Sequence, residues 1–384
     1  MTIAFSAPAS AAVARWRRAA GPMHFFLLGM VFATWAARIP AVRDALGLSP
    51  AQLGAVLLCG GIGALLAFPL AAWLIARHGA RRAAWYSGLA LLLSLPCLAL
   101  APSIALLMAA MTALGASASC FDVAINAAAA AAEQAAGRSL MSLLHAWFSV
   151  GTVGGALLGS AAAGTGLAPL PHFATIAGLL ALPLWLGCRA LPLHRPAPSV
   201  GRKKFALPHG PLVALGVICF CGAMAEGAIA DWSGVFMKDR LGATEAVAPL
   251  AFAAFSAAML VVRLVGDRLK DRFGARRVVA YGAALAAIGL FVPVAADGVA
   301  LAIGGFALAG AGLAGVFPFV FSAAGRHGST ALAGVATMGY GGGLFGPPAI
   351  GFIANAFGLQ VALGFVGLLG VAIALAAGRA RWLR

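Results

Sequence analysis

The sequence predicts an all-α membrane protein with twelve transmembrane helices in two pseudo-symmetric six-helix halves. Three observations lead to this fold class. Of the 384 residues, 62% are hydrophobic and only 9% are charged, apolar runs recur along the chain, and two loop sequences occur twice at one fixed offset. A soluble domain carries roughly a quarter charged residues. The composition, with a mean hydropathy of +0.99, therefore excludes a water-soluble fold.

Twelve apolar segments are long enough to cross a bilayer, which takes about 20 residues of helix. They are residues 22–41, 50–76, 83–100, 104–132, 139–164, 170–190, 211–235, 246–267, 277–296, 300–324, 331–356 and 359–378. An even number of crossings returns the chain to the side on which it began. Both termini are therefore expected on the same side of the membrane.

Lys and Arg are concentrated in alternate loops. Of the 26 basic residues, 21 fall on the side of the termini and one, Arg263, falls within a helix. The four on the opposite side are Arg38, Arg43, Lys238 and Arg240. Because basic loops stay inside the cell, both termini are predicted to be cytoplasmic, in a multi-pass protein of a bacterial inner (plasma) membrane. The same distribution accounts for the net charge of +16, so no nucleic-acid partner is expected.

The chain is predicted to divide at a cytoplasmic linker, residues 191–210, which holds four prolines and four basic residues. Proline and clustered like charge both oppose a spanning helix. The predicted order is a cytoplasmic tail at 1–21, a first six-helix half at 22–190, the linker, a second half at 211–378 and a tail at 379–384.

Two loops support an internal repeat. Arg77-His-Gly-Ala-Arg-Arg82 matches Arg272-Phe-Gly-Ala-Arg-Arg277 in five of six positions, 195 residues apart. At the same offset, Arg43-Asp-Ala-Leu-Gly-Leu-Ser49 aligns with Lys238-Asp-Arg-Leu-Gly-Ala-Thr244. Long internal repeats of this kind are typical of transporters.

The stretch Gly266-Asp-Arg-Leu-Lys-Asp-Arg-Phe-Gly-Ala-Arg-Arg277 resembles the loop signature of the major facilitator superfamily of secondary transporters. The resemblance implies the twelve-helix major facilitator fold and a cytoplasmic gate in which Asp271 accepts hydrogen bonds from a neighbouring helix N-terminus or from arginines. The first copy has Ala72 and Ala76 where the signature has Gly and Asp. The alternative is that these charges only end the helices. The predicted gate residues are Gly266, Asp271, Arg272, Gly274, Arg276 and Arg277, with Arg77, Gly79 and Arg81 in the first copy.

Charged and polar residues within the membrane point to a function or a specific contact, since inserting a charge there costs at least about 2.5–3.5 kcal/mol of free energy. Asp122 lies ~15 Å from the inner end of its helix, and Asn126 lies one turn further on the same face. The pair is interpreted as a site for solute hydrogen bonding and proton carriage, with an interhelical clamp as the alternative. In the next helix His145, with Ser149 on its face, could contact solute, relay a proton or bond a neighbouring helix.

The second half carries its own membrane charges. Glu226 is a candidate binding or coupling acid, whereas Asp231 and Arg38 lie nearer the outer surface, where Arg38 could pair with Asp231 or attract an anionic solute. Arg263 precedes Asp267 by four residues, the spacing of an ion pair along a helix.

Phe121-Asp-Val-Ala-Ile-Asn-Ala-Ala128 and Leu144-His-Ala-Trp-Phe-Ser-Val-Gly151 are similar to helices 4 and 5 of the fucose permease branch of proton–sugar symporters. By that resemblance Asp122 takes the position of a helix 4 carboxylate, Asn126 that of the helix 4 Asn, and His145 that of a helix 5 polar residue that contacts solute. The sugar permeases also carry an acid in helix 1, which the stretch Phe32-Ala-Thr-Trp-Ala-Ala-Arg38 lacks. Proton coupling is therefore expected to fall on Asp122 or Glu226.

The predicted function is secondary transport of a small polar solute, a sugar or related metabolite, coupled to protons and performed by a monomer in the lipid bilayer. The alternative is a proton-coupled exporter of drugs or metabolites on the same fold; a non-transporting sensor also stays open. An enzyme would need clustered acids, His or Cys at one membrane face, and no such motif occurs. The six Cys lie in apolar runs without ligand-like spacing, so no metal and no cofactor are expected.

Overall fold

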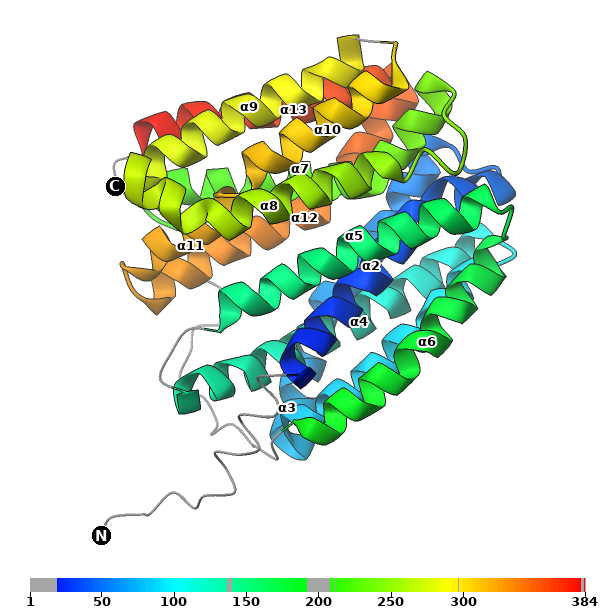
Figure 1. Cartoon of the computed structure of the whole chain (residues 1–384), viewed down its shortest axis with the longest axis horizontal. Helices are drawn as coiled ribbons and strands as arrows, with labels where there is room; N and C mark the ends of the chain where they lie inside the picture. The colour runs from blue at the N-terminus through cyan, green and yellow to red at the C-terminus, as the bar shows by residue number, and fades with distance from the viewer. Residues whose placement is uncertain are drawn as a thin grey trace. The chain divides into compact units, whose positions relative to one another are not determined.

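The computed structural model describes residues 19–136, 140–191, 208–210, 212–295, 297–380 and 383, and no β-strand occurs in these ranges. Most of the predicted linker and of the N-terminal tail lie outside the described residues. The helices, labelled in Figure 1, are α2 (Gly21–Ala45), α3 (Pro50–Leu100), α4 (Ile104–Ala136), α5 (Met141–Gly164), α6 (Pro169–Ala190), α7 (Leu212–Leu241), α8 (Leu250–Phe273), α9 (Ala275–Ala295), α10 (Val299–Leu313), α11 (Val316–Gly325), α12 (Ser329–Phe357) and α13 (Leu359–Arg379).

Ten of the described helices are long and apolar enough to cross a membrane. One of them, the 51-residue α3, changes direction at Gly79, where φ is 81° and ψ is 160°. The segment Val299–Gly325, which joins α10 and α11, forms a single span, and α12 is not among the ten. With α3 taken as two arms and α12 included, the helices fit the twelve predicted spans.

The chain forms two compact units. Unit 1 consists of Met1–Trp35, Cys59–Gly155 and Gly166–Val200, and unit 2 of Ala36–Leu58, Ala156–Thr165 and Gly201–Arg384. Unit 2 therefore holds α7–α13 together with one end each of α2, α3 and α5. The division into two six-helix halves stays a prediction.

In unit 1, α2 and α5 pack backbone to backbone because glycines line their contact. A Cβ added at Gly155 would lie 2.6 Å from the carbonyl oxygen of Met30 and 2.9 Å from the Cβ of Ala33. A Cβ at Gly29 or at Gly151 would likewise fall on a carbonyl oxygen of the other helix. Small residues allow such close approach between membrane helices, as the glycine pattern of α5 predicts.

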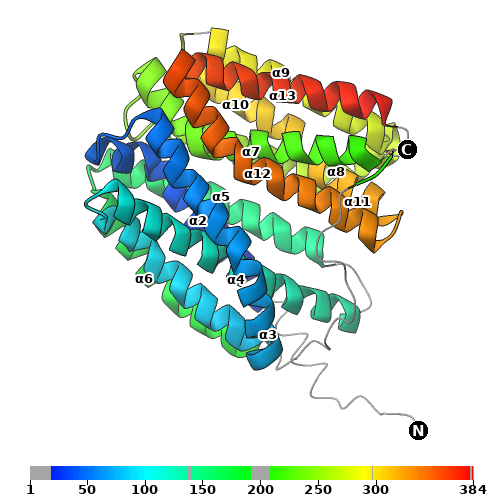
Figure 2. The same ribbon diagram turned by 180° about the vertical axis from the view of Figure 1, so that it is seen from behind.

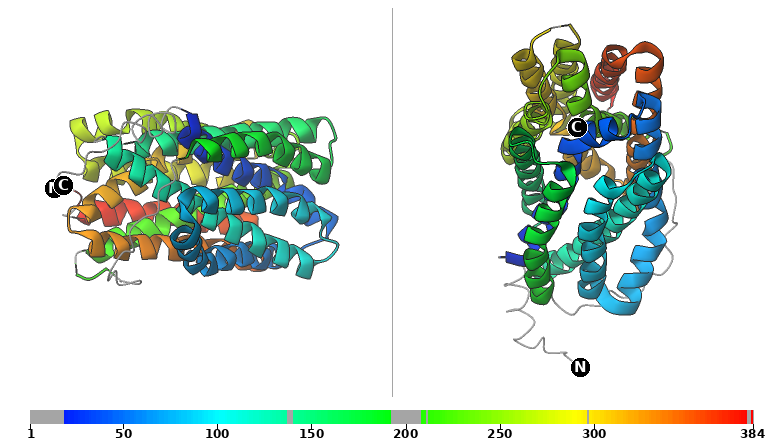
Figure 3. Two further views of the ribbon diagram at one scale, coloured as in Figure 1. Left: turned by 90° about the horizontal axis from the view of Figure 1, so that it is seen from below. Right: turned by 90° about the vertical axis from the view of Figure 1, so that its right-hand side faces the viewer.

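In unit 2, α7 lies beside α12 and α13 in both Figure 1 and Figure 2. The helices of this unit run side by side along most of their lengths in Figure 3. α9 and α10 meet at reciprocal glycines: a Cβ at Gly289 would lie 2.6 Å from the oxygen of Gly305, and one at Gly305 would lie 2.5 Å from the oxygen of Gly289. Because these helices pack so closely, little empty space is left between them, except beside a helix face that has no neighbouring helix.

The sequence repeat reappears in the backbone. Gly47 and Gly242, 195 residues apart, have φ values of 60° and 62°, and Gly79 and Gly274, at the same offset, have 81° and 79°. All four residues sit at helix ends in the left-handed region that only glycine adopts without strain. The two copies of each loop therefore turn the chain in the same way.

Candidate functional site

Asp122 and Asn126 form the polar pair of α4. The side-chain nitrogen Nδ2 of Asn126 donates hydrogen bonds to Oδ1 of Asp122, at 2.8 Å, and to the backbone oxygen of Asp122, at 2.9 Å. Both residues are half-buried within unit 1. Because both donors of the amide are used, the pair offers oxygen acceptors, the Oδ1 atom of Asn126 and the second carboxyl oxygen of Asp122.

His145 and Ser149 lie one turn apart on α5 but differ in exposure. The ring of His145 is exposed and meets the ring of Phe25 on α2 edge-on, with centroids 5.2 Å apart. Ser149 is buried, and its hydroxyl donates to the backbone oxygen of His145 at 3.3 Å. His145 is therefore presented at the surface of unit 1, whereas the Ser149 hydroxyl turns back onto its own helix.

α7 has one partly open face although most of its circumference is buried. Phe220, Ala223, Gly227 and Asp231 follow one another at helical spacing and are half-buried, whereas the residues between them are mostly buried. A Cβ added at Gly227 would meet no atom within 4 Å. Two turns further along, a Cβ at Gly234 would contact Pro40 of α2 at 3.5 Å. Asp231 therefore lies between an open part and a closed part of the same helix face.

Glu226 projects from α7 toward α8. Its Oε1 atom lies 3.8 Å from Nη2 of Arg263, and both side chains are about three-quarters buried, at 24% and 25% exposure. This ion pair joins two helices, and the pairing of Arg263 with Asp267 along α8 stays a prediction. A carboxylate at this depth thus has a cation on the neighbouring helix.

A group of charged residues connects the end of α2 with the end of α7. Arg43 donates to the carboxylate of Asp239 through Nη1 and Nη2, at 2.5 and 2.7 Å. Lys238 donates to Asp44 at 2.6 Å and to Glu245 at 2.9 Å. We refer to Arg38, Arg43, Asp44, Lys238, Asp239 and Glu245 as the charged cluster.

Arg38 joins the charged cluster from one turn earlier on α2. It is 3% exposed, and with Glu245 and Pro40 it lines a small pocket of unit 2. Glu245, in the turn after α7, is an acid close enough to Arg38 to act on its charge, and the pairing of Arg38 with Asp231 stays a prediction. With Glu245 included, the cluster holds three cations and three anions.

The two loops of the predicted gate keep similar turns but differ in their contacts. Gly274 follows α8 and its N–H bonds the oxygen of Lys270 at 2.7 Å, while Arg276 donates to the backbone oxygen of Gly378 at the end of α13. Asp271 is exposed, and within the described part of the chain its side chain makes no hydrogen bond or ion pair. The latch role of Asp271 therefore stays a prediction.

The other predicted gate residues lie around the kink of α3 and where α8 leads into α9. Gly266 is buried, and a Cβ added to it would lie 3.6 Å from the ring of Phe319. Arg272 and Arg277 are exposed, and Arg81 is half-buried. The guanidinium of Arg77 lies 5.7 Å from the ring centre of Trp73.

Two polar contacts of unit 1 were missed by the sequence analysis. Glu133 of α4 accepts hydrogen bonds from the backbone N–H groups of Leu140, at 2.8 Å, and Met141, at 3.1 Å, and so caps the N-terminus of α5. His24 of α2 is buried, with Nε2 3.4 Å from the Sγ of Cys188 on α6. The cap by Glu133 could have been predicted, because an acid shortly before the start of a helix is a favourable partner for the helix N-terminus. Nothing in the sequence pairs His24 with Cys188.

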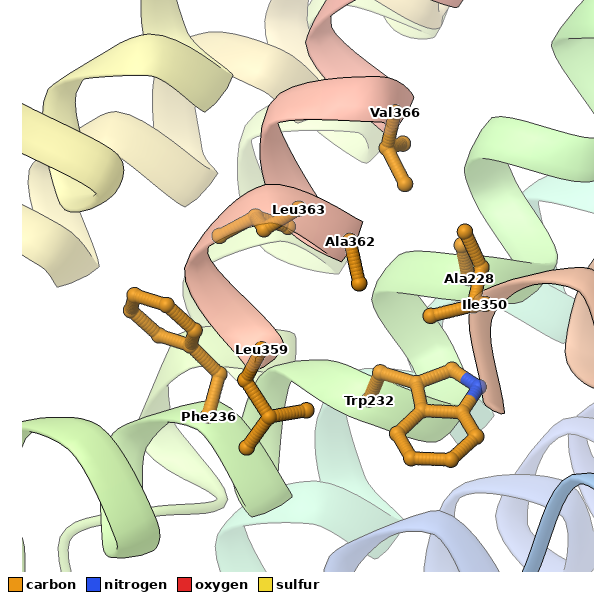
Figure 4. Close-up of a pocket in the computed structure, with 8 residues that line it drawn as sticks. All are labelled: Ala228, Trp232, Phe236, Ile350, Leu359, Ala362, Leu363 and Val366. Atoms are coloured by element: carbon orange, nitrogen blue, oxygen red, sulfur yellow. The ribbon is translucent and has the colours of Figure 1, made fainter. Parts of the chain in front are cut away.

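The pocket in Figure 4 lies between α7, α12 and α13. Its lining is apolar, with Leu359, Ala362 and Val366 of α13 facing Trp232 of α7. None of the predicted solute-binding residues is part of it. Within the described ranges, no three His, Cys, Asp or Glu side chains come together as metal ligands would.

Comparison with known proteins identifies the class. The model of the Major Facilitator Superfamily matches residues 20–327 and 214–384, so the chain belongs to this family of membrane transporters. It is not an enzyme. An uncharacterised MFS-type transporter of Yersinia pestis is 38% identical over 92% of this chain and 93% of its own length. Membrane protein MosC of Rhizobium meliloti is 33% identical over 92% of this chain and 87% of its own length.

Solved structures agree on the fold. The nucleoside transporter NupG superposes with a TM-score of 0.75 at 15% identity, covering 94% of this chain and 99% of that one. A bacterial homologue of the human lysosomal transporter Spinster, in an inward-facing and occupied conformation, gives 0.68 at 17% identity, with 94% and 91% covered. At these identities the likeness concerns the fold alone.

Proposed function

We propose that this transporter moves a small polar solute across a bacterial inner membrane by alternating access, coupled to protons, with both termini in the cytoplasm. The excess of basic residues on the side of the termini supports this orientation. Among branches of the superfamily, the α4 and α5 sequences favour the sugar permease-like one. The solute is then a sugar or a related metabolite rich in hydroxyl groups.

The observation that carries the proposal is the Asp122–Asn126 pair. Its amide donors are consumed within the pair, so oxygen acceptors face the surroundings. A solute that donates several hydrogen bonds complements such a group, because buried acceptors left unpaired are costly. Hydroxyl-rich and amino-bearing solutes fit this chemistry, and apolar cations do not.

Asp122 is also the better proton carrier of the two candidate acids. Glu226 has the Arg263 guanidinium as a counter-ion, whereas the neighbour bonded to Asp122 is a neutral amide. An ionised carboxylate without a cation is expensive within a bilayer, and protonation removes that cost. Protonated Asp122 gains one O–H donor, so solute contacts and protonation are linked at the same side chain.

The open and closed parts of the α7 face support alternating access. In this structure α7 touches α2 at Gly234 and through Lys238, whereas the face is open at Gly227. A rocking motion would open the contact with α2 and expose Asp231 to that side of the membrane. Asp231 then lies near the path that the solute takes.

The test is thermal stabilisation of the purified protein by a panel of sugars, sugar acids, amino acids, nucleosides and cationic drugs at two pH values. A ligand that binds only the native state raises the apparent melting temperature by mass action. We expect a hydroxyl-rich hit whose effect depends on pH and is lost in Asp122→Asn. The matched control is Asp297→Asn, which removes an exposed acid and should keep the hit. A hit among apolar cations that is indifferent to Asp122 would contradict the proposal and favour the exporter.

A further inference from the structure

The long helix α3 exposes apolar side chains along one face of each of its two arms. The exposed residues are Ile62, Leu66 and Leu70 on the arm before Gly79, and Leu89, Leu93 and Leu100 on the arm after it. Within each set they are spaced four or seven residues apart, so each set forms a single stripe along its arm. Leu66 is 69% exposed and Leu93 is 62% exposed. Exposed apolar surface of this extent marks a place where the protein meets another molecule or lipid.

Toward the kink, each stripe leads to an exposed aromatic residue and then to an exposed arginine. Trp73 and Arg77 continue the first stripe at helical spacing, and Tyr86 and Arg82 continue the second. The ring of His78 lies between Trp73 and Tyr86 and meets each of them edge-on, with centroids 5.9 Å apart in both contacts. We refer to these five residues as the kink group. Its rings join the two apolar stripes across the bend of the helix.

The kink group is basic and lies far from acids. No Asp or Glu occurs in the chain between Asp44 and Asp122. The acids of unit 1 are Asp122, within α4, and Glu133, whose carboxylate caps the start of α5. The guanidinium of Arg77 lies 5.7 Å from the ring centre of Trp73, a cation–π contact that leaves its positive charge uncompensated. A molecule that complements this group carries a negative charge.

The second copy of the loop does not have this combination. At the offset of 195 residues Arg272 corresponds to Arg77, but an arginine stands at the place of Trp73. The second copy also holds Asp267 and Asp271, which have no counterpart in the first. Its positive charges therefore have acids beside them, whereas those of the kink group do not.

We propose that the kink group binds the head group of an anionic phospholipid whose acyl chains lie along the two stripes of α3. Arg77 and Arg82 hold the phosphate, because a guanidinium donates paired hydrogen bonds to phosphate oxygens. Trp73 and Tyr86 lie between the arginines and the leucines, where a lipid has its ester groups and where such amphipathic rings concentrate in membrane proteins. An anionic lipid supplies both the charge and the two apolar chains that this surface lacks.

The charge of the head group decides which lipid binds. A zwitterionic lipid offers the same chains and phosphate, but its ammonium group opposes the arginines. In the orientation proposed above, the kink group lies at the cytoplasmic leaflet, whose anionic lipids attract basic segments next to the membrane. Only this choice of leaflet depends on the proposed orientation, and the binding itself does not depend on the proposed transport.

The site can be tested by native mass spectrometry of the purified protein, titrated in detergent with a diacyl phosphatidylglycerol. The readout is the dissociation constant of the most tightly bound lipid. We expect Arg77→Gln to weaken binding about fivefold, which corresponds to about 1 kcal/mol, the usual contribution of one basic residue near anionic lipid. Arg82→Gln should give a similar loss, and it decides the matter if Arg77→Gln does not fold.

The matched control is Arg272→Gln, which removes the same charge from the corresponding position of the second copy and should leave binding within twofold of the parent. Phosphatidylcholine with the same chains should bind the parent at least about fivefold more weakly than phosphatidylglycerol. A phosphatidylglycerol with a photoactivatable group on its acyl chain should crosslink to α3, within residues 62–73 and 86–100. This last readout places the lipid on the two stripes.

Binding within twofold of the parent when Arg77→Gln and Arg82→Gln are combined would overturn the proposal. An equal loss in Arg272→Gln would also overturn it, since the effect would then follow from any lost positive charge. Equal binding of phosphatidylcholine, or displacement of the lipid by an equal concentration of inorganic phosphate, would contradict a site for an anionic lipid. Crosslinks confined to other helices would show that the lipid binds elsewhere.

Discussion

The substitution Gly155→Ala tests the close contact of α2 and α5 in unit 1. The added Cβ would lie 2.6 Å from the oxygen of Met30, 2.9 Å from the Cβ of Ala33 and 3.0 Å from the nitrogen of Thr34. Optimal contacts between heavy atoms lie at about 3.5–4.0 Å, so the helices must separate by about 1 Å. The atoms that would be displaced belong to the backbone or to a Cβ, so no side-chain rotation can relieve the overlap.

Overpacking of this kind costs about 1–3 kcal/mol. At about 2–4 °C per kcal/mol, we expect the apparent melting temperature to fall by about 2–12 °C. The measurement is the loss of the monodisperse peak on size-exclusion chromatography after heating in detergent. The matched control is its neighbour, Gly154→Ala, because a Cβ there would meet only the flexible end of Met30, with Cε at 3.0 Å.

Gly154→Ala should change the melting temperature by less than about 1 °C or raise it, since alanine is favoured over glycine in a helix by about 0.5–1 kcal/mol. Equal melting temperatures for the two variants would refute the packing account. The α2–α5 contact would then be looser than the structure has it.

Three further changes give separate tests. Glu133→Ala should speed amide hydrogen exchange at the start of α5, because the cap of Leu140 and Met141 is worth about 0.5–2 kcal/mol; an equal effect in Gln134→Ala, on an exposed neighbour, would argue against a cap. Gly274→Ala should lower the melting temperature through its φ of 79° alone, since a Cβ there meets nothing within 4 Å, whereas Gly364→Ala, within α13, should leave it unchanged or raise it. Glu226→Gln should destabilise the protein by removing the acid on α7 that faces the partly buried Arg263 cation, and adding Arg263→Gln should restore part of the loss; a double variant less stable than the single one would contradict the ion pair.

Much of the fold follows from the sequence because membrane helices are specified locally. Each span needs only its own run of apolar residues, and most predicted spans agree with the described helices to within a few residues. The Asp122–Asn126 pair is also local, one turn apart on a single helix, and its hydrogen bond could be anticipated from the spacing. The glycines of α5 predict close packing for the same reason.

Contacts between helices distant in sequence were harder to predict. The structure pairs Arg263 with Glu226 on the adjacent helix, a contact that the spacing of Arg263 and Asp267 along α8 does not indicate. Both copies of the loop at Arg43 and Lys238 were recognised, yet their reciprocal pairing depends on a two-fold arrangement that no single stretch contains. Spacing along one helix says nothing of the neighbour's charges, so the partners of these residues had to come from the structure.

The central claim is proton-coupled transport of a polar solute through the Asp122 site. The most direct measurement is uptake of the solute identified by thermal stabilisation into proteoliposomes, with and without an imposed pH gradient. The account predicts that the gradient speeds uptake by the parent protein, that a protonophore abolishes this gain, and that Asp122→Asn shows no gain. Uptake that is equally fast with and without the gradient, in the parent as in Asp122→Asn, would contradict it.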